Sequence, residues 1–190
     1  MDEFINYLLQ FGDLNQQQID LVKSKFKYME MPKDAFYLEA GRVPKELIFI
    51  TEGIMRLCYY NHKGDEITKY FADENQLVGD VANFNLGTPA SEYLQAITDC
   101  TYLAISKKDM DELSQTIIAW DAIMSKIAAK CLTDKVNKIS TMMAEDATER
   151  YLNFLKNFPS IANRIPLSYL ASFLGITQSS LSRIRKNTTL

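Results

Sequence analysis

The stretch that decides the fold lies near the carboxyl end, where residues 165–186 read IPLSYLASFLGITQSSLSRIRK. Apolar residues recur at helical spacing on both sides of a short break, Leu174-Gly175-Ile176-Thr177, which predicts two short amphipathic helices. Gly175 can adopt the left-handed conformation that ends the first helix, and Thr177 can cap the second. Ala171 is small where the two helices must cross closely. The shared apolar core is expected to contain Leu170, Leu174, Ile176, Leu181 and Ile184. The pattern predicts a helix-turn-helix unit.

The second of these helices carries side chains suited to double-stranded DNA. Gln pairs with adenine and Arg with guanine, so both can read bases in the major groove. Hydroxyl groups and free amides near the start of a helix can bind phosphate, a role open to Thr177 and Ser180. The predicted DNA-binding residues are Thr177, Gln178, Ser179, Ser180, Ser182, Arg183 and Lys186. The alternative is an ordinary helical hairpin with a solvated face of serine and arginine.

Charge is divided unevenly along the chain. The net charge of the 190 residues is −3, but residues 147–190 hold six basic residues and one acidic residue, a net charge of +5. Residues 1–146 therefore carry −8, and no Asp or Glu occurs from residue 160 onward. A basic end on an acidic body is typical of a small nucleic-acid-binding unit joined to another domain. The division favours DNA binding over a solvated hairpin.

Two other patterns precede this unit. Residues 2–31 have helical spacing, with Asn15 as a candidate N-cap and Pro32 as the end of the segment. Over residues 35–105, short apolar runs alternate with turns that contain glycine, which predicts antiparallel strands in a small barrel or sandwich. Residues 79–93 are interpreted as a turn of that structure.

A long helix is predicted between the strands and the carboxyl-terminal unit. Residues 117–143 contain no Gly or Pro, and apolar residues recur there every three or four positions. Only one face is needed to pack on the strands, so the remaining apolar stripe is expected to join two copies of the chain. Full burial within one chain is the alternative. Asp134, Lys135 and Lys138 interrupt a strict heptad, which argues against a sustained coiled coil. Asp146 is a candidate N-cap for a further helix over residues 147–158.

Cysteine and histidine are too few for most metal chemistry. Cys58, Cys100 and Cys131 form no C-x-x-C motif, so we expect no disulfide framework or iron–sulfur cluster, and interpret them as small buried side chains. The one histidine, His62, lies in a predicted turn and cannot form a multi-histidine zinc site. We expect no metal, no cofactor and no enzyme activity. Residues 1–10 do not form a signal peptide, and no apolar run is long enough to cross a bilayer, so a cytoplasmic protein without a membrane partner is expected.

In this order the segments resemble the cyclic-AMP receptor protein/fumarate–nitrate regulator (CRP/FNR) family of bacterial transcription regulators. The resemblance covers nearly all 190 residues. Its motifs are Glu39-Ala40-Gly41, residues 47–53, residues 64–71, Leu77-Val78-Gly79-Asp80 and, most closely, residues 170–185. The family joins an antiparallel β-roll of the cyclic-nucleotide-binding type, a long dimerisation helix and a winged helix-turn-helix. The resemblance therefore implies an α+β fold.

The resemblance also implies a function. It predicts a sequence-specific regulator that binds double-stranded DNA as a homodimer, with RNA polymerase and an unknown small-molecule effector as further partners. The implied domains are the amino-terminal helices and β-roll sensor (1–116), the dimerisation helix (117–144) and the helix-turn-helix domain (145–190). Only residues 187–190 follow the second helix, so the family's wing is expected to be absent or truncated. The alternative is a small-ligand sensor, of cyclic-nucleotide-binding or cupin-like type, without a DNA role.

The departures from the family concern the ligand. Members that bind cyclic AMP carry Gly-Glu where this chain has Gly79-Asp80, and Arg-Ser where it has Ala90-Ser91. A buried cyclic phosphate without the arginine would lack a cationic partner, at a cost on the order of several kcal/mol. A Thr-Ser pair of the family matches Lys135 and Val136. The resemblance places a ligand pocket at Gly79, Asp80, Ser91 and Lys135, and we expect cyclic AMP not to be its ligand.

Overall fold

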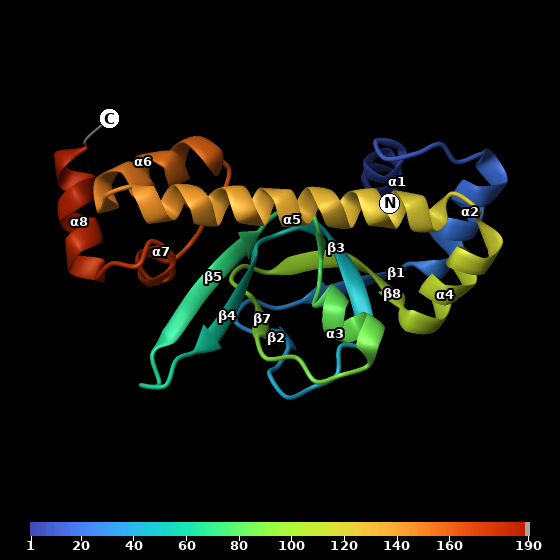
Figure 1. The fold of residues 1–190 in the computed structure, drawn as a ribbon, viewed down its shortest axis with the longest axis horizontal. Coiled ribbons are helices and arrows are strands. Elements are labelled where there is room, and N and C mark those ends of the chain that lie inside the picture. The colour runs from blue at the N-terminus through green and yellow to red at the C-terminus, as the bar shows by residue number, and fades with distance from the viewer. Residues whose placement is uncertain (189–190) are drawn as a thin grey trace.

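A computed structural model describes residues 1–188, and for residue 135 and residues 137–144 it describes the backbone alone. Two helices come first, then strands interrupted by one short helix, then five more helices in the described chain. Figure 1 shows the longest helix, α5 (Trp120–Ala144), crossing the strands from the amino-terminal helices to the carboxyl-terminal ones. No helix in this described part is long and apolar enough to cross a membrane.

The chain begins with α1 (Asp2–Leu9) and α2 (Gln16–Lys25). The predicted N-cap of α2 is confirmed. The Asn15 side chain accepts a hydrogen bond from the backbone N–H of Gln18 at 2.9 Å, and Gln18 Oε1 accepts one from the backbone N–H of Asn15 at 2.9 Å.

The prediction of helix up to residue 31 is wrong at its end. Residues 27–31 form the strand β1 (Lys27–Met31), which pairs antiparallel with β8 (Cys100–Ser106). Because β1 is mostly exposed, its sequence lacks the apolar alternation of a half-buried strand. Pairing with β8, rather than a local pattern, decides its conformation.

The predicted antiparallel strands are confirmed. Two four-stranded antiparallel sheets have the orders β1-β8-β3-β6 and β2-β7-β4-β5. Their other strands are β2 (Phe36–Leu38), β3 (Glu46–Glu52), β4 (Met55–Tyr60), β5 (Glu66–Ala72), β6 (Leu77–Val78) and β7 (Tyr93–Ala96). A short helix, α3 (Val81–Leu86), lies inside the segment interpreted as a turn. We call the two sheets with α3 the roll; β5 is one of its edge strands.

The roll and the start of α5 share one core. After α4 (Lys107–Thr116), the α5 residues Trp120, Ile123 and Ile127 are each 1% exposed. They pack in one apolar cluster with residues of α1, α2 and sheet strands: Phe4, Leu8, Val22, Phe49 and Leu103. Because α5 contributes directly to this core, its first half is fixed relative to the roll.

The carboxyl-terminal helices are α6 (Ala147–Asn157), α7 (Leu167–Phe173) and α8 (Gln178–Asn187). The chain leaves α5 through an extended Glu145, with φ −99° and ψ 148°. Asp146 caps α6 as predicted, in a capping box with Glu149. α4 ends at Thr116 and α5 ends at Ala144, and the division of the chain into domains at these residues stays a prediction.

Candidate nucleic-acid interface and ligand cavity

The two predicted helices of the quoted stretch are present as α7 and α8. Gly175 lies between them with φ +68°, the left-handed conformation that the sequence predicted. Thr177 caps α8, because its Oγ1 accepts a hydrogen bond from the backbone N–H of Ser180 at 3.1 Å. Buried residues hold the two helices together: Leu170, Ala171, Leu174 and Leu181 are each 3% exposed or less, and Ile176 and Ile184 are partly buried.

The structure brings the seven predicted DNA-binding residues together at one helix. Gln178, Ser179, Arg183 and Lys186 are exposed on α8, the preceding Thr177 is exposed, and Ser180 and Ser182 are half-buried. Arg185, which was not among the predicted DNA-binding residues, is a further exposed cation of α8. The hydroxyl groups at the start of α8 form a small network, with Thr177 Oγ1 2.9 Å from Ser180 Oγ and 3.0 Å from Ser179 Oγ. Figure 1 places α8 at one end of the molecule.

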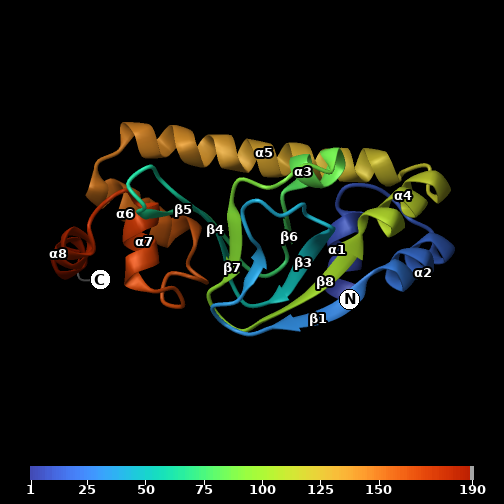
Figure 2. The same ribbon diagram turned by 90° about the horizontal axis from the view of Figure 1, so that it is seen from below.

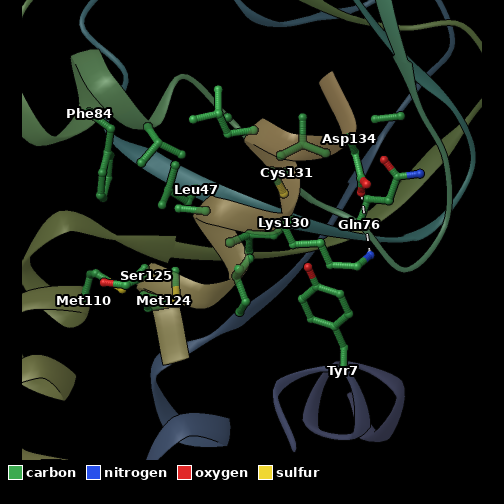
Figure 3. Close-up of a pocket in the computed structure, with 18 of the residues that line it drawn as sticks. Tyr7, Leu47, Gln76, Phe84, Met110, Met124, Ser125, Lys130, Cys131 and Asp134 are labelled. Atoms are coloured by element: carbon green, nitrogen blue, oxygen red, sulfur yellow. Dashed lines mark ion pairs between the residues drawn. The ribbon is translucent and has the colours of Figure 1, made fainter. Parts of the chain in front are cut away.

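A second candidate site is a cavity of about 770 Å³ between α5 and the roll. Figure 3 shows side chains from α1, the roll, α4 and α5 converging on it. Much of its wall is apolar, including Leu47, Phe84, Met110, Trp120, Met124 and Cys131. Tyr7 and Gln76 add polar groups. The volume is that of an ordinary small-molecule site.

The described charged residues of this wall are mainly acidic. Four are aspartates (Asp73, Asp111, Asp121 and Asp134) and two are lysines (Lys107 and Lys130). Each lysine is paired with an aspartate on its own helix: Lys107 Nζ lies 2.8 Å from Asp111, and Lys130 Nζ lies 3.7 Å from Asp134. Burial, with smaller contributions from Cys131 and Asp134, raises the pKa of Tyr7 to about 12, so its hydroxyl stays protonated. The wall therefore suits a neutral or cationic molecule better than an anion.

The four ligand residues expected from the resemblance fall in different places. Gly79 lines the cavity. Asp80 caps α3, with its carboxylate accepting hydrogen bonds from the backbone N–H and the side-chain amide of Asn83. Ser91 is exposed and is not among the cavity-lining residues. The Lys135 side chain lies outside the described residues.

Ala90 is the position at which the resemblance leads us to expect the arginine of members that bind cyclic AMP. It is 4% exposed and packs in the apolar cluster that also contains Leu38 and Leu94. Its backbone N–H donates to the carbonyl oxygen of Arg42 at 2.9 Å. The position is thus part of the apolar core of the roll.

The prediction that the cysteines are small buried side chains is confirmed for Cys58 and Cys100 but is wrong for Cys131, which is only partly buried and lines the cavity. Cys58 and Cys100 are buried and unbridged, and burial is the main cause that raises the pKa of each thiol. His62 is exposed in the turn between β4 and β5. No cluster of three or more metal-ligating side chains occurs among the residues that the structure describes.

Comparison with known proteins agrees with this geometry. Residues 28–116, which run from β1 through α4, match the family model described as cyclic nucleotide-binding domain. This segment is therefore similar to cyclic nucleotide-binding domains. No curated protein matches the sequence.

Solved structures extend the likeness beyond the cyclic nucleotide-binding domain. The c-di-GMP responsive global regulator CLP of Xanthomonas campestris is 18% identical to this chain. The match covers 91% of this chain and 91% of CLP, with a TM-score of 0.71. A putative CRP/FNR-family transcriptional regulator of Eubacterium rectale is also 18% identical, covers 96% of this chain and 87% of its own, and gives 0.74. FixK2 of Bradyrhizobium japonicum is 14% identical over 85% of this chain and 83% of its own, with a TM-score of 0.74. The resemblance to CRP/FNR regulators is confirmed at the level of this domain and of the fold.

Proposed function

We propose that the chain is a homodimeric transcription regulator of the CRP/FNR type, which binds specific double-stranded DNA through α8. The observation that carries the proposal is the exposed face of α8. It presents amide, hydroxyl and basic groups, and the described residues from 160 to 188 contain no carboxylate side chain to repel phosphate. RNA polymerase is proposed as a further partner, and only the resemblance to the family supports it.

The exposed side of α5 supports a homodimer. Ala122, Ser125, Ala129, Leu132 and Val136 are all exposed and follow each other at spacings of three and four residues. Leu132 is 64% exposed and Val136 is 55% exposed. Such a seam matches the a and d positions of two packed helices. Ser125 and Leu132 also line the cavity, but none of the five seam residues belongs to the buried core that α5 shares with the roll, so a second α5 could pack there without displacing that core.

We also propose that the effector, if the regulator has one, is not cyclic AMP. The described residues do not fit a cyclic phosphate: Ala90 supplies no cation, Asp80 is used as a helix cap, and both lysines of the cavity are paired with aspartates. The cavity instead suits a neutral or cationic molecule that is largely apolar, with Tyr7 and Gln76 for polar contacts.

The experiment that tests DNA binding replaces Arg183. A site is first selected from random duplex DNA with the full chain, and affinity is then measured by fluorescence anisotropy at a fixed salt concentration. Arg183→Ala should weaken binding to the selected site by about 10- to 100-fold, as expected when a base contact is lost. Lys108→Ala is the matched control, because Lys108 is an exposed cation on α4, at the opposite end of the molecule in Figure 1.

Two results would contradict the proposal. If Arg183→Ala binds the selected site as tightly as the unmodified chain, α8 does not read DNA. If the unmodified chain selects no DNA site at moderate salt, the alternative of a ligand-sensing module without a DNA role is favoured.

A further inference from the structure

The carboxyl-terminal helices are joined to α5 by the chain, and they also pack directly on the roll. Figures 1 and 2 both show α7 beside β5. The backbone of an edge strand presents unpaired N–H and C=O groups on its free side. One α7 side chain satisfies one group of each kind. Ser172 Oγ accepts a hydrogen bond from the backbone N–H of Thr68 at 2.9 Å and donates to the carbonyl oxygen of Glu66 at 3.1 Å.

A buried arginine of the roll faces the same helix. Arg56 on β4 is 1% exposed. Its guanidinium lies 2.7 Å from Glu66 Oε1, donates to Gln95 Oε1 from Nε (2.9 Å) and Nη2 (2.6 Å), and donates from Nη1 to Thr68 Oγ1 at 3.2 Å. The ring of Tyr169 on α7 covers the guanidinium, with its centroid 3.6 Å from Arg56 Cζ. The aromatic ring thus completes the environment of a charge that is withdrawn from water.

Apolar contacts also join α8 to the roll. Ile54, Phe71 and Ile97 of the roll belong to one cluster with buried residues of α6, α7, α8 and the turn after α7: Tyr151, Phe154, Leu170, Leu174 and Leu181. The ring centroids of Phe71 and Phe173 are 5.2 Å apart. Leu181, which is fully buried, lies on the same helix as Arg183. The direction of the exposed face of α8 is therefore tied to the roll.

The contacts between the carboxyl-terminal helices and the roll matter because of how the chain leaves α5. α5 ends at Ala144 and the chain continues through extended Glu145, which is a potential pivot. The first half of α5 is fixed to the roll by its core, and the seam proposed for the dimer lies on α5. Contacts between α7 and the roll therefore fix the position of α8 relative to the axis of the proposed dimer. Without these contacts, rotation of the chain at Glu145 would leave that position free.

We propose that Arg56, Tyr169 and Ser172, which we call the roll–α7 clamp, determine the half-site spacing that the dimer accepts on DNA. The proposal rests on the proposed function. Each base pair added between two half-sites moves them apart by about 3.4 Å and rotates them by about 35°. A clamped pair of α8 helices fits one spacing, whereas an unclamped pair can follow several.

The experiment uses the full chain and the selected DNA site, with the central spacer unchanged, lengthened or shortened by one and two base pairs. The unmodified chain should lose about tenfold or more in affinity for each altered spacer. Tyr169→Leu, which removes the ring over Arg56, should bind the original spacer more weakly and differ by less than about threefold among the spacers. Tyr169→Phe keeps the ring and should retain the spacing preference. Ser168→Ala, at an exposed α7 serine, is the control for changes on that helix.

A second measurement does not depend on DNA. The backbone N–H of Thr68 donates to Ser172, so its hydrogen exchange reports whether α7 is docked. Exchange at Thr68 should be faster in Tyr169→Leu and Ser172→Ala than in Tyr169→Phe or Ser168→Ala, while circular dichroism verifies that each variant is folded.

The outcomes separate the two proposals. The clamp is contradicted if folded Tyr169→Leu keeps both the slow Thr68 exchange and the spacing preference of the unmodified chain. Fast exchange with an unchanged spacing preference contradicts the role in spacing. If the unmodified chain selects no DNA, the proposed function fails and the spacing role fails with it, whereas the Thr68 exchange still tests the clamp.

Discussion

Trp120 is the single tryptophan of the chain, and it lies in the wall of the cavity beneath α5. It is 1% exposed, and its indole N–H donates to the Sδ atom of Met110 at 3.2 Å. A molecule that enters the cavity should change the surroundings of this ring, so tryptophan emission reports occupancy without a label.

We predict opposite responses to two probes. Cyclic AMP at about 1 mM should leave the emission of Trp120 unchanged, because the described lysines of the wall are already paired with aspartates. The neutral aromatic N-phenyl-1-naphthylamine should quench it by energy transfer. Ala128→Phe places a large side chain in the cavity wall and should reduce the quenching. Saturable quenching by cyclic AMP at micromolar concentration would refute our interpretation of Ala90 and the cavity.

At the scale of elements, a second anchor joins the loop before α7 to the strands. Arg164 donates to both carboxylate oxygens of Glu74, at 3.1 and 2.6 Å, and Ser160 donates to Asp73 at 2.9 Å. Burial raises the pKa of Glu74, but hydrogen bonds from Arg164 and from backbone N–H groups, that of Gly53 included, outweigh it. The pKa therefore lies below the usual 4.5.

This shift predicts a pH dependence of stability. A carboxyl group with a lowered pKa in the folded state stabilises that state above pH 4.5, and the contribution disappears as the pH falls through the folded-state pKa. Both side chains of the pair are partly exposed, so Glu74→Gln should cost only about 0.5–1 kcal/mol in the free energy of unfolding at pH 7. Urea unfolding at pH 7 and pH 3 measures the difference. It should be smaller at pH 3 than at pH 7, and the exposed Glu52→Gln should show no such change. An equal cost at both pH values would show that the ion pair is not its source.

The elements that could be predicted from the sequence are those with local signals. Asn15, Asp146 and Thr177 act as N-caps because each side chain bonds to an N–H within three residues, and Gly175 ends a helix through its own backbone freedom. β1 was missed because only its pairing with β8 makes it a strand, and α3 because its six residues are too short for a period.

The candidate sites also divide into those with a local sequence signal and those that depend on the assembled fold. All predicted DNA-binding residues lie in one segment, so their grouping required only a helix. Docking of α7 on the roll joins residues more than 100 positions apart, such as Thr68 and Ser172, and no local pattern signals it. The buried Arg56 likewise has partners on two other strands, β5 and β7, and on α7, which only the assembled fold brings together.

At the scale of the whole molecule, the proposed function requires two chains to pair, and the exposed seam of α5 is the surface that we propose for this pairing. Two copies must pair through it for their α8 helices to reach successive major grooves about 34 Å apart. Because Leu132 is 64% exposed, a charge at this position should leave the single chain folded and should destabilise only the packing of two α5 helices.

We therefore predict that Leu132→Asp is monomeric at micromolar concentration by analytical ultracentrifugation, with a circular dichroism spectrum like that of the unmodified chain. Its affinity for the selected DNA site should fall by about 100-fold or more, because the second half-site is no longer bound within the same complex. Met29→Asp is the matched control: Met29 is 45% exposed on β1, which Figure 2 shows on the side of the roll away from α5. A folded Leu132→Asp variant that remains a dimer would place the interface on another surface, and then the clamp would set the position of α8 relative to a different axis.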